Sequence, residues 1–283
     1  MTGVSNTSFA PGISTQTDYL TAGGHRLEYK YLRASSSTRP VVVFLHEGLG
    51  SIALWREFPR QVFDSCDCSI LLYSRYGYGH SQQLTEARKA DFMHDEALIT
   101  LPELLDKLEV HNPVLFGHSD GASIALIHAG GSQRPVAGLT VMAPHVNVEQ
   151  VCLSSIRAAA HAFRNTDLPQ KLGRYHANAE STFWGWNNIW LDSEFESWSI
   201  EAYLPKIECP ILAIQGEEDE YGTMRQIELI GQTVRNASLL KVPDCRHSPH
   251  RDQPGVVITA LQQFLSRLES GCDHDQSNGV RER

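Results

Sequence analysis

The sequence has no apolar stretch long enough to cross a membrane. Its longest apolar runs cover residues 41–45 and 211–214, whereas a membrane-spanning helix needs roughly 20 such residues. The first residues, MTGVSNTSFAPGISTQTD, contain neither the basic start nor the apolar core of a secretory signal. We therefore expect a cytoplasmic protein that has no membrane partner.

Basic residues are fewer than acidic ones, and the cysteines form no repeated pair. The chain has 24 Lys and Arg against 33 Asp and Glu, which gives a formal net charge of −9. Such a surface repels phosphate backbones and anionic lipids, so we expect no nucleic-acid partner. The six cysteines are scattered, and Cys66 and Cys68 are too close for an easy disulfide. This pattern is typical of a reducing cytoplasm.

Motifs that bind cofactors or metals are also missing. There is no Walker loop and no HExxH, and Gly77-Tyr78-Gly79 lacks the third glycine of a dinucleotide-binding turn. His247 and His250 have a spacing that metal ligands use, but no third ligand is clustered near them. We expect neither a cofactor nor a metal site.

What the sequence does contain is an alternation of strands and helices. Residues 18–34 alternate apolar and polar side chains around Gly23-Gly24, which predicts a β-hairpin. Buried strands are predicted at 41–46, 69–74, 113–119, 138–144, 210–216 and 238–244. Helical spacing separates them, at 53–65, 93–110, 122–130, 225–234 and 256–270. This order predicts an α/β fold, with a mostly parallel central sheet and helices on both faces.

One segment interrupts the alternation. Residues 147–205 carry helical patterns but no strand, and they hold four of the five Trp residues. We interpret this segment as a helical cap over the carboxyl edge of the sheet, where ligands bind in open α/β folds. The core then comprises residues 17–146 and 206–269. Residues 1–16 and 270–283 lack an apolar period and are predicted to be disordered tails.

The strongest chemical signal is Gly117-His118-Ser119-Asp120-Gly121. It follows a predicted strand and precedes a predicted helix, which is the context that the G-x-S-x-G nucleophile elbow requires. The serine of such an elbow has a strained backbone, and a side chain two residues away on either side would crowd the turn. The plainer alternative is an ordinary serine at the start of a helix.

With this motif the chain resembles the α/β-hydrolase family over residues 17–269. His46-Glu47-Gly48-Leu49-Gly50-Ser51 resembles the oxyanion loop of that family, and residues 74–81 resemble its Gly-x-Gly-x-Ser turn. Asp219 follows a strand where the family places its acid, and His247 follows the last strand, where it places its base. The resemblance implies an α/β-hydrolase fold with a helical cap and a serine nucleophile.

The resemblance also implies a role for each of these residues. Ser119 attacks a carbonyl, His247 accepts its proton, and Asp219 fixes the imidazole tautomer, because a weak alcohol needs an oriented base. The order Ser, Asp, His along the chain is the order of this fold. The backbone N–H groups of Gly48 and Asp120 would stabilise the oxyanion, each by roughly 3 kcal/mol.

Several alternatives remain open at this stage. Three carboxylates flank Asp219 and compete for the role of the acid, namely Glu217, Glu218 and Glu220. Arg246 stands where the family usually has Gly before the base. His250 lies three residues after His247, and we interpret it as a structural residue that pairs with Asp252.

Five further side chains are candidates for the substrate pocket. Glu47 stands where the family commonly has Gly, and it either faces the substrate or ties down the loop. His145 follows the strand at 138–144 and is expected to face the cap. Trp184, Trp186 and Trp190 either form an aromatic wall of the pocket or attach the cap to the sheet. Trp186 and Trp190 are four residues apart, so they share a helix face.

The combined signals predict a serine hydrolase that cleaves a small or medium carboxylic ester through an acyl-enzyme. A lactone, a thioester or a C–C bond also fits, because this fold hosts many chemistries. Two alternatives from other classes are a cofactor-independent oxygenase and a non-catalytic, receptor-like binding module. The partner is expected to be a small molecule, and a monomer and a homodimer fit the sequence equally.

Overall fold

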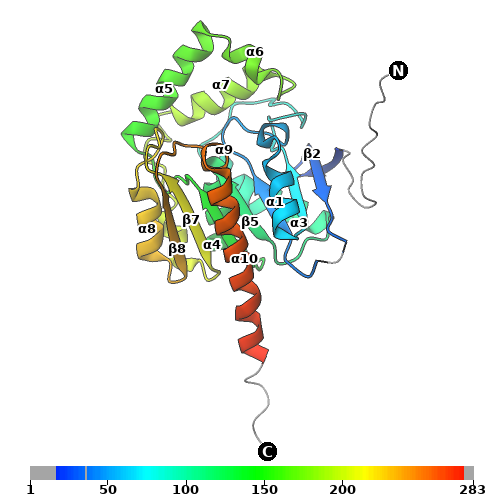
Figure 1. The fold of residues 1–283 in the computed structure, drawn as a ribbon. Coiled ribbons are helices and arrows are strands. Elements are labelled where there is room, and N and C mark those ends of the chain that lie inside the picture. The colour runs from blue at the N-terminus through cyan, green and yellow to red at the C-terminus, as the bar shows by residue number, and fades with distance from the viewer. Residues whose placement is uncertain (1–16, 36, 277–283) are drawn as a thin grey trace, which may run out of the picture.

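An eight-stranded sheet forms the centre of the molecule (Figure 1). The computed structural model describes residues 17–35 and 37–276, and the side chains up to residue 270. Along the sheet the strand order is β1-β2-β4-β3-β5-β6-β7-β8. The bounds of these strands are β1 Asp18–Ala22, β2 His25–Leu32, β3 Val42–Leu45, β4 Ile70–Tyr73, β5 Val114–His118, β6 Gly138–Met142, β7 Ile211–Gly216 and β8 Ala237–Val242.

Strand pairing confirms the predicted fold class. β1 and β2 form the expected antiparallel hairpin, and β2 is also antiparallel to β4. All pairings from β4 through β3, β5, β6 and β7 to β8 are parallel. The carboxyl ends of six neighbouring strands therefore meet at one edge, where loops from distant parts of the sequence come together.

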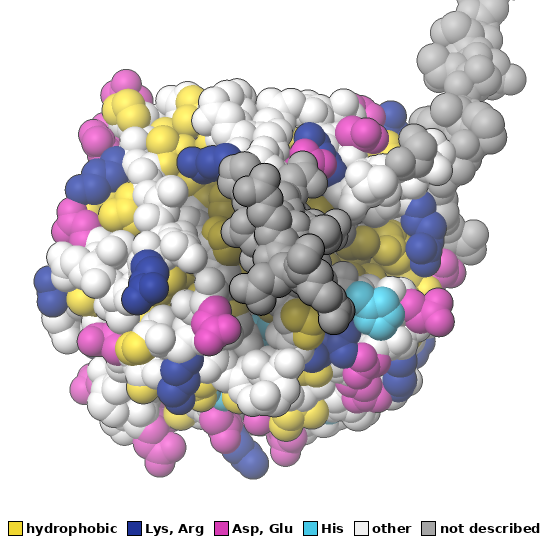
Figure 2. All heavy atoms as spheres, turned by 90° about the horizontal axis from the view of Figure 1, so that it is seen from below, with side chains coloured by type: hydrophobic (Ala, Val, Ile, Leu, Met, Phe, Trp, Pro, Cys, Tyr) yellow, Lys and Arg dark blue, Asp and Glu magenta, His cyan; other side chains and the backbone are white. Residues whose placement is uncertain are grey.

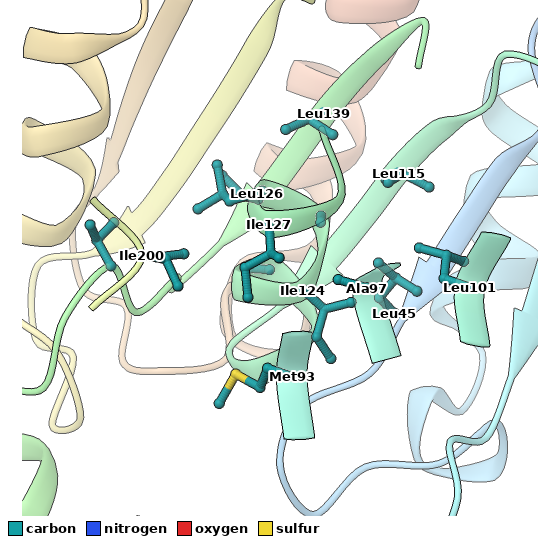
Figure 3. Close-up of a cluster of buried hydrophobic side chains, with 14 of the residues drawn as sticks. Leu45, Met93, Ala97, Leu101, Leu115, Ile124, Leu126, Ile127, Leu139 and Ile200 are labelled. Carbon is teal, nitrogen blue, oxygen red and sulfur yellow. The ribbon is translucent and has the colours of Figure 1, made fainter. Parts of the chain in front are cut away.

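Side chains of the central strands alternate between two buried clusters, one on each face of the sheet. Val43, Leu45 and Leu115 belong to the first cluster, which also contains residues of α3 (Leu101–Lys107), α4 (Asp120–Gly131) and α8 (Arg225–Thr233). Figure 3 shows part of this cluster around α4. Phe44 and Phe116 belong to the second cluster, together with residues of α1 (Phe58–Cys66) and α10 (Pro254–Gln276). Both faces are covered, which agrees with the mostly apolar sequences of the central strands.

The helix predicted at 93–110 is divided into three elements. α2 (Phe92–Asp95) passes into the π-helical turn η2 (Glu96–Thr100), which passes into α3. Pro102 lies at the start of α3 and has no N–H to donate to the preceding turn, so the ladder of hydrogen bonds changes there. A short 3₁₀ turn, η1 (Ala53–Trp55), similarly precedes α1.

Helices also fill the segment between β6 and β7. They are α5 (Gln150–Asn165), α6 (Leu168–Leu172) and α7 (Ala179–Trp190), followed by the 3₁₀ helix η3 (Glu201–Lys206). In Figure 1 helices α5, α6 and α7 lie above one end of the sheet. Only an isolated bridge between Asn147 and Ser199 has β character in this part of the described chain.

More of the predicted C-terminal tail than of the predicted N-terminal tail lies within the described residues. α10 continues to Gln276, past position 270 where the sequence predicts the C-terminal tail to begin. Each residue added to an existing helix gains a backbone hydrogen bond, so a helix extends beyond its last packed apolar side chain. The predicted N-terminal tail, residues 1–16, lies outside the described residues.

Charged and apolar side chains are mixed on the surface of the molecule. In the view of Figure 2, acidic and basic side chains are interspersed with apolar ones, without a large patch of one sign. Within residues 17–35 and 37–276, none of the helices combines the length and the hydropathy needed to traverse a lipid bilayer.

Candidate active site

Ser119 lies at the sharp turn between β5 and α4. Its φ of 52° and ψ of −119° are strained values for a residue with a side chain. A Cβ on Gly121 would overlap the backbone of Leu45, and one on Gly117 would overlap Ala122. The turn therefore needs glycine on both sides, and it directs the serine hydroxyl away from the sheet.

A chain of hydrogen bonds joins Ser119, His247 and Asp219. The Ser119 Oγ lies 3.0 Å from His247 Nε2, and His247 Nδ1 lies 2.8 Å from Asp219 Oδ1 and 2.9 Å from Oδ2. These side chains come from three loops that are up to 128 positions apart in the sequence. The arrangement has the distances and the order of a serine, an imidazole base and an orienting carboxylate.

The electrostatics of this chain keep Asp219 ionised. Burial raises the pKa of Asp219, but the nearby His247 and the N–H of Tyr221 lower it more, so the net shift is downward. Burial lowers the pKa of His247, whereas the charge of Asp219 and its hydrogen bond raise it, and the net shift is upward. Asp219 also accepts a hydrogen bond of 2.7 Å from the Gln215 side chain.

The carboxylates beside Asp219 have other positions. Glu217 and Glu218 are exposed. One oxygen of Glu220 accepts a hydrogen bond from the backbone N–H of His247 at 3.2 Å, and the other pairs with Arg246. Only Asp219 lies at the imidazole ring, and Glu220 holds the backbone of the same loop.

His250 is buried against aromatic rings and does not pair with Asp252 as predicted. Its ring lies 4.8 Å from that of Trp55, and burial lowers its pKa far below the usual value. Asp252 instead accepts a hydrogen bond from the N–H of Arg246 at 2.9 Å, because the turn at residues 248–252 directs this carboxylate back to the loop.

Arg75 fixes the loop that carries Gly48. The guanidinium of Arg75 donates to the carbonyl oxygens of His46 and Glu47, the latter at 3.1 Å. The backbone N–H of Arg75 donates to the His46 ring. The N–H of Asp120 begins α4 and so has no acceptor within the helix. A Cβ on Gly48 would lie 3.1 Å from Asp120 Oδ2, so these two residues are neighbours beside Ser119.

The carboxylate of Glu47 points toward His118 and Arg251. Its two oxygens lie 3.5 Å from His118 Nδ1 and 3.4 Å from Arg251 Nη2. Burial raises the pKa of Glu47, but these two partners lower it well below its usual value. His118 Nε2 in turn lies 2.7 Å from the carbonyl oxygen of His247. These contacts tie down the loop, as one of the two predicted possibilities has it, and Glu47 also lies on the wall of the cavity beside Ser119.

A cavity of about 110 Å³ lies next to Ser119 and His247. His145 and Tyr221 lie on its wall, and burial and the neighbouring His247 lower the pKa of His145 to about 3, so its ring is neutral. The cap contributes Cys152 and three other side chains, namely Ile156, Trp186 and Trp190. The cap therefore forms one wall of this small cavity.

Trp184 does not reach this cavity, contrary to the prediction. It packs against Phe163 and Phe183, and the guanidinium of Arg164 lies 4.7 Å from the ring centre. At about 100° per residue, positions 186 and 190 of α7 lie about 40° apart and share a face. Position 184 is turned by about 160° from the first and about 120° from the second, so it points to another side.

Sequence reasoning missed the side chains that support the site without forming it. Arg75, Gln215 and Tyr221 are the clearest cases. Arg75 lies within residues 74–81, a segment that resembles a glycine-containing turn of the family. The available signal for a supporting role was its position, as a charged residue directly after a buried strand. Nothing in the sequence indicates that its guanidinium reaches back to the neighbouring loop.

A family comparison agrees with this geometry. The model of the alpha/beta hydrolase family matches residues 42–260, which is most of the chain. The chain therefore belongs to the alpha/beta hydrolase family, and a hydrolase activity is supported at that level.

Individual relatives are distant. A proline iminopeptidase of Saccharolobus solfataricus is 21% identical over 91% of this chain and 94% of its own. Among solved structures, that of VinJ has a TM-score of 0.72 at 21% identity, with 90% of this chain and 99% of that chain covered. A thermophilic esterase from Thermogutta terrifontis has a TM-score of 0.68 at 19% identity, with 90% and 99% covered. At these identities, the structural likeness establishes the fold.

Proposed function

We propose that the protein is a cofactor-free serine hydrolase that cleaves a small carboxylic ester through an acyl-enzyme. The observation that supports this most directly is the continuous hydrogen-bond chain from Ser119 through His247 to Asp219. An ester fits best because its carbonyl accepts an alcohol nucleophile and its leaving group needs only one proton. Thioesters, lactones and C–C bonds activated by a carbonyl follow the same first step.

In the first half of the proposed reaction, His247 Nε2 accepts the hydroxyl proton as Ser119 Oγ attacks the carbonyl carbon. The imidazolium is stabilised by Asp219, which holds Nδ1–H. The carbonyl C=O becomes a single bond, and its negative oxygen lies between the N–H groups of Gly48 and Asp120. When the intermediate collapses, His247 returns the proton to the leaving alcohol and an ester bond to Ser119 remains.

Water completes the reaction in the second half. His247 accepts a proton from a water molecule, the resulting hydroxide adds to the acyl carbon, and Ser119 leaves with the proton. The carboxylic acid is released, and the enzyme returns to its starting state. Each step uses only groups of this chain and water, so no external cofactor enters the proposal.

The cavity supports a small acyl group. Its volume of about 110 Å³ is below the roughly 300 Å³ at which drug-sized ligand pockets begin. A short acyl chain fits this space, whereas an octanoyl chain exceeds it and has to extend beyond the cavity. We therefore propose that acetyl and butyryl esters are better substrates than octanoyl esters.

The test is hydrolysis of p-nitrophenyl acetate, butyrate and octanoate by the wild type and by Ser119→Ala. We expect turnover that falls with acyl length, and a loss of at least about 10⁴-fold in kcat for the variant. Intact-mass analysis after a fluorophosphonate probe is expected to show one label, which is absent in Ser119→Ala. A folded wild type that is neither labelled nor active contradicts the proposal.

The alternatives give different results in the same assay. A cofactor-independent oxygenase consumes oxygen with a heteroaromatic substrate and does not depend on acyl transfer to Ser119. A receptor-like module binds a ligand tightly without turnover. A peptidase, as the name of the Saccharolobus solfataricus relative suggests, releases p-nitroaniline from proline p-nitroanilide faster than it cleaves the matched esters.

A further inference from the structure

His176 lies in the cap, between α6 and α7, and both nitrogens of its buried ring contact the core of the protein. Nδ1 accepts a hydrogen bond of 2.9 Å from the backbone N–H of Gly79, and Nε2 lies 2.9 Å from the carbonyl oxygen of Leu49. Because a carbonyl only accepts, the proton of the ring is on Nε2. Burial lowers the pKa of His176, which favours the neutral ring that these two bonds require.

Leu49 belongs to the turn that carries one of the proposed oxyanion donors. The N–H of Gly50 donates to the carbonyl oxygen of Glu47 at 3.0 Å, which closes a β-turn over residues 47–50. This bond links two peptide groups in series, the one that follows Leu49 and the one that precedes Gly48. The N–H and C=O of a trans peptide point in opposite directions, so the second group directs the N–H of Gly48 away from the bonded carbonyl.

The ring of His176 is the first donor in this series. Its Nε2–H donates to the first peptide group, the N–H of that group donates to the second, and the N–H of the second is that of Gly48. Hydrogen bonds in such a series polarise and orient one another, so the first donor acts on the last N–H. From the core, Arg75 supplies a further donor to the carbonyl of Glu47 at 3.1 Å. The cap therefore reaches the proposed oxyanion site through the backbone of the turn.

The position of His176 depends on how the cap lies on a second loop of the core. The N–H of Ala177 donates to the carbonyl oxygen of Gly79 at 2.8 Å, so the cap binds both backbone groups of Gly79. Gly79 has a φ of 56°, and a Cβ at this position would overlap Glu28 Oε1. Position 79 therefore requires glycine, and the glycine-containing turn gives the cap a fixed support.

We propose that His176 is a positioning residue for the oxyanion site, and that it couples the placement of the cap to the orientation of the Gly48 N–H. This inference rests on the proposed function and deepens it, because the oxyanion role of Gly48 is part of that proposal. A cap that lies on Gly79 supplies the donor for Leu49 and completes the series. A cap that shifts away removes this donor, and the Gly48 N–H is then less well oriented.

Two substitutions of His176 separate its two hydrogen bonds. His176→Gln keeps an N–H donor near the position of Nε2, whereas His176→Asn keeps only an acceptor near the position of Nδ1. We expect His176→Asn to lower kcat for p-nitrophenyl butyrate by roughly 10- to 100-fold, because the oxyanion donor is displaced, and to change KM by less than about threefold. His176→Gln is expected to keep kcat within about threefold of the wild type.

Inhibition by propylboronic acid gives a second readout of the oxyanion site. Its boron takes the place of the carbonyl carbon of the butyryl group, and the adduct with Ser119 directs an oxygen toward the oxyanion donors. Analogues of the transition state respond to the same contacts as kcat/KM. We therefore expect His176→Asn to weaken this inhibition by the factor by which it lowers kcat/KM, whereas His176→Gln should leave it unchanged.

Thr182→Val is the matched control. The buried Thr182 hydroxyl donates to the carbonyl oxygen of Gly77 at 2.8 Å, so it also joins the cap to the core but does not contact the turn at 47–50. We expect Thr182→Val to lower the Tm and to keep kcat within about twofold. Thermal unfolding of each variant shows that it is folded. If His176→Asn does not fold, His176→Leu, which also lacks the donor, replaces it.

The outcomes separate the two proposals. A loss of kcat in His176→Gln that equals or exceeds the loss in His176→Asn overturns this inference, and so does a similar loss in Thr182→Val, because the contact then only attaches the cap. An effect of His176→Asn that is confined to KM, or no effect at all, overturns it as well. These results leave the ester hydrolase intact, since the wild type still depends on Ser119. Absence of Ser119-dependent turnover by the wild type removes the proposed function and this inference with it.

Discussion

The imidazole of His247 lies between the Ser119 hydroxyl and the Asp219 carboxylate, and burial and the carboxylate shift its pKa in opposite directions. Asp219 raises the pKa of His247 above the usual value of about 6.5, although burial opposes the shift. The base acts only when neutral, so its active fraction increases as the pH rises through this pKa. We expect kcat/KM to increase with pH along a limb whose midpoint lies above 6.5. A midpoint at or below 6.5, in rates measured with p-nitrophenyl butyrate, contradicts the assignment.

Removal of the Asp219 charge tests whether this carboxylate orients the imidazole of His247. Asp219→Asn keeps the size of the side chain but offers a donor where His247 Nδ1–H needs an acceptor, so the wrong tautomer is stabilised. We expect a loss of about 10⁴-fold in kcat. The neighbouring Glu218→Gln, which changes an exposed carboxylate, is the control and should retain activity. If Glu220→Gln rather than Asp219→Asn shows the large loss, Glu220 is the acid.

At the level of residues, the sequence singled out Ser119, His247 and Asp219, which the structure joins in one chain of hydrogen bonds, but not the residues that support them. Ser119 was identifiable because its elbow needs glycine at two fixed positions. Arg75, His118 and Gln215 were not, because each acts on residues at least four and up to 129 positions away along the chain. Trp184 was misplaced because two residues along a helix change the face that a side chain occupies.

Among the secondary-structure elements, the buried strands were the most predictable. Each was an apolar run bounded by turn residues, and the observed bounds of β3 to β8 differ from the predicted ones by at most two residues. The hairpin of β1 and β2 followed from Gly23 and Gly24, which both have positive φ values. The division at η2 escaped prediction because the apolar spacing of α2 and α3 continues through the π turn.

The loop after β3, the end of β5 and the segment after β8 meet through Glu47. Its carboxylate contacts His118 and Arg251, and His118 contacts the carbonyl of His247. Because the carboxylate faces these groups, Glu47→Gln should lower kcat by about tenfold through a displaced base. It should leave the preference between cationic and neutral esters unchanged within about twofold.

Rates on the phenyl butyrate and 3-aminobutyrate esters provide the measurement. Glu57→Gln, which alters an exposed carboxylate at the start of α1, is the matched control. A selective loss of rate on the cationic ester in Glu47→Gln indicates instead that this carboxylate acts on the substrate from the cavity wall.

At the scale of the whole molecule, the cap and the sheet belong to one packed unit. Trp186 and Trp190 of α7 are part of the same buried cluster as Leu115 of β5. The sequence predicted the cap from the absence of strands and the concentration of Trp. It did not predict how closely the cap packs, because that depends on pairs of residues far apart in sequence.

This shared cluster has a consequence for unfolding. Four of the five Trp residues lie in the segment between β6 and β7, so Trp fluorescence reports mainly on the cap, whereas far-UV circular dichroism reports on the whole chain. Since one cluster joins cap and sheet, we expect the two signals to change at the same temperature.

Phe116 provides the decisive variant, because it is fully buried in the cluster on the opposite face of the sheet. Phe116→Ala should reduce the free energy of unfolding by about 3–5 kcal/mol and shift both signals together. The control, Leu239→Ala, truncates a side chain that is 40% exposed and should have a much smaller effect. Separate transitions, with the fluorescence change unaffected by Phe116→Ala, indicate a cap that unfolds on its own. In that case the cap wall of the small cavity is lost when the cap unfolds. The acyl-length preference depends on that wall, so it should disappear at the temperature of the first transition.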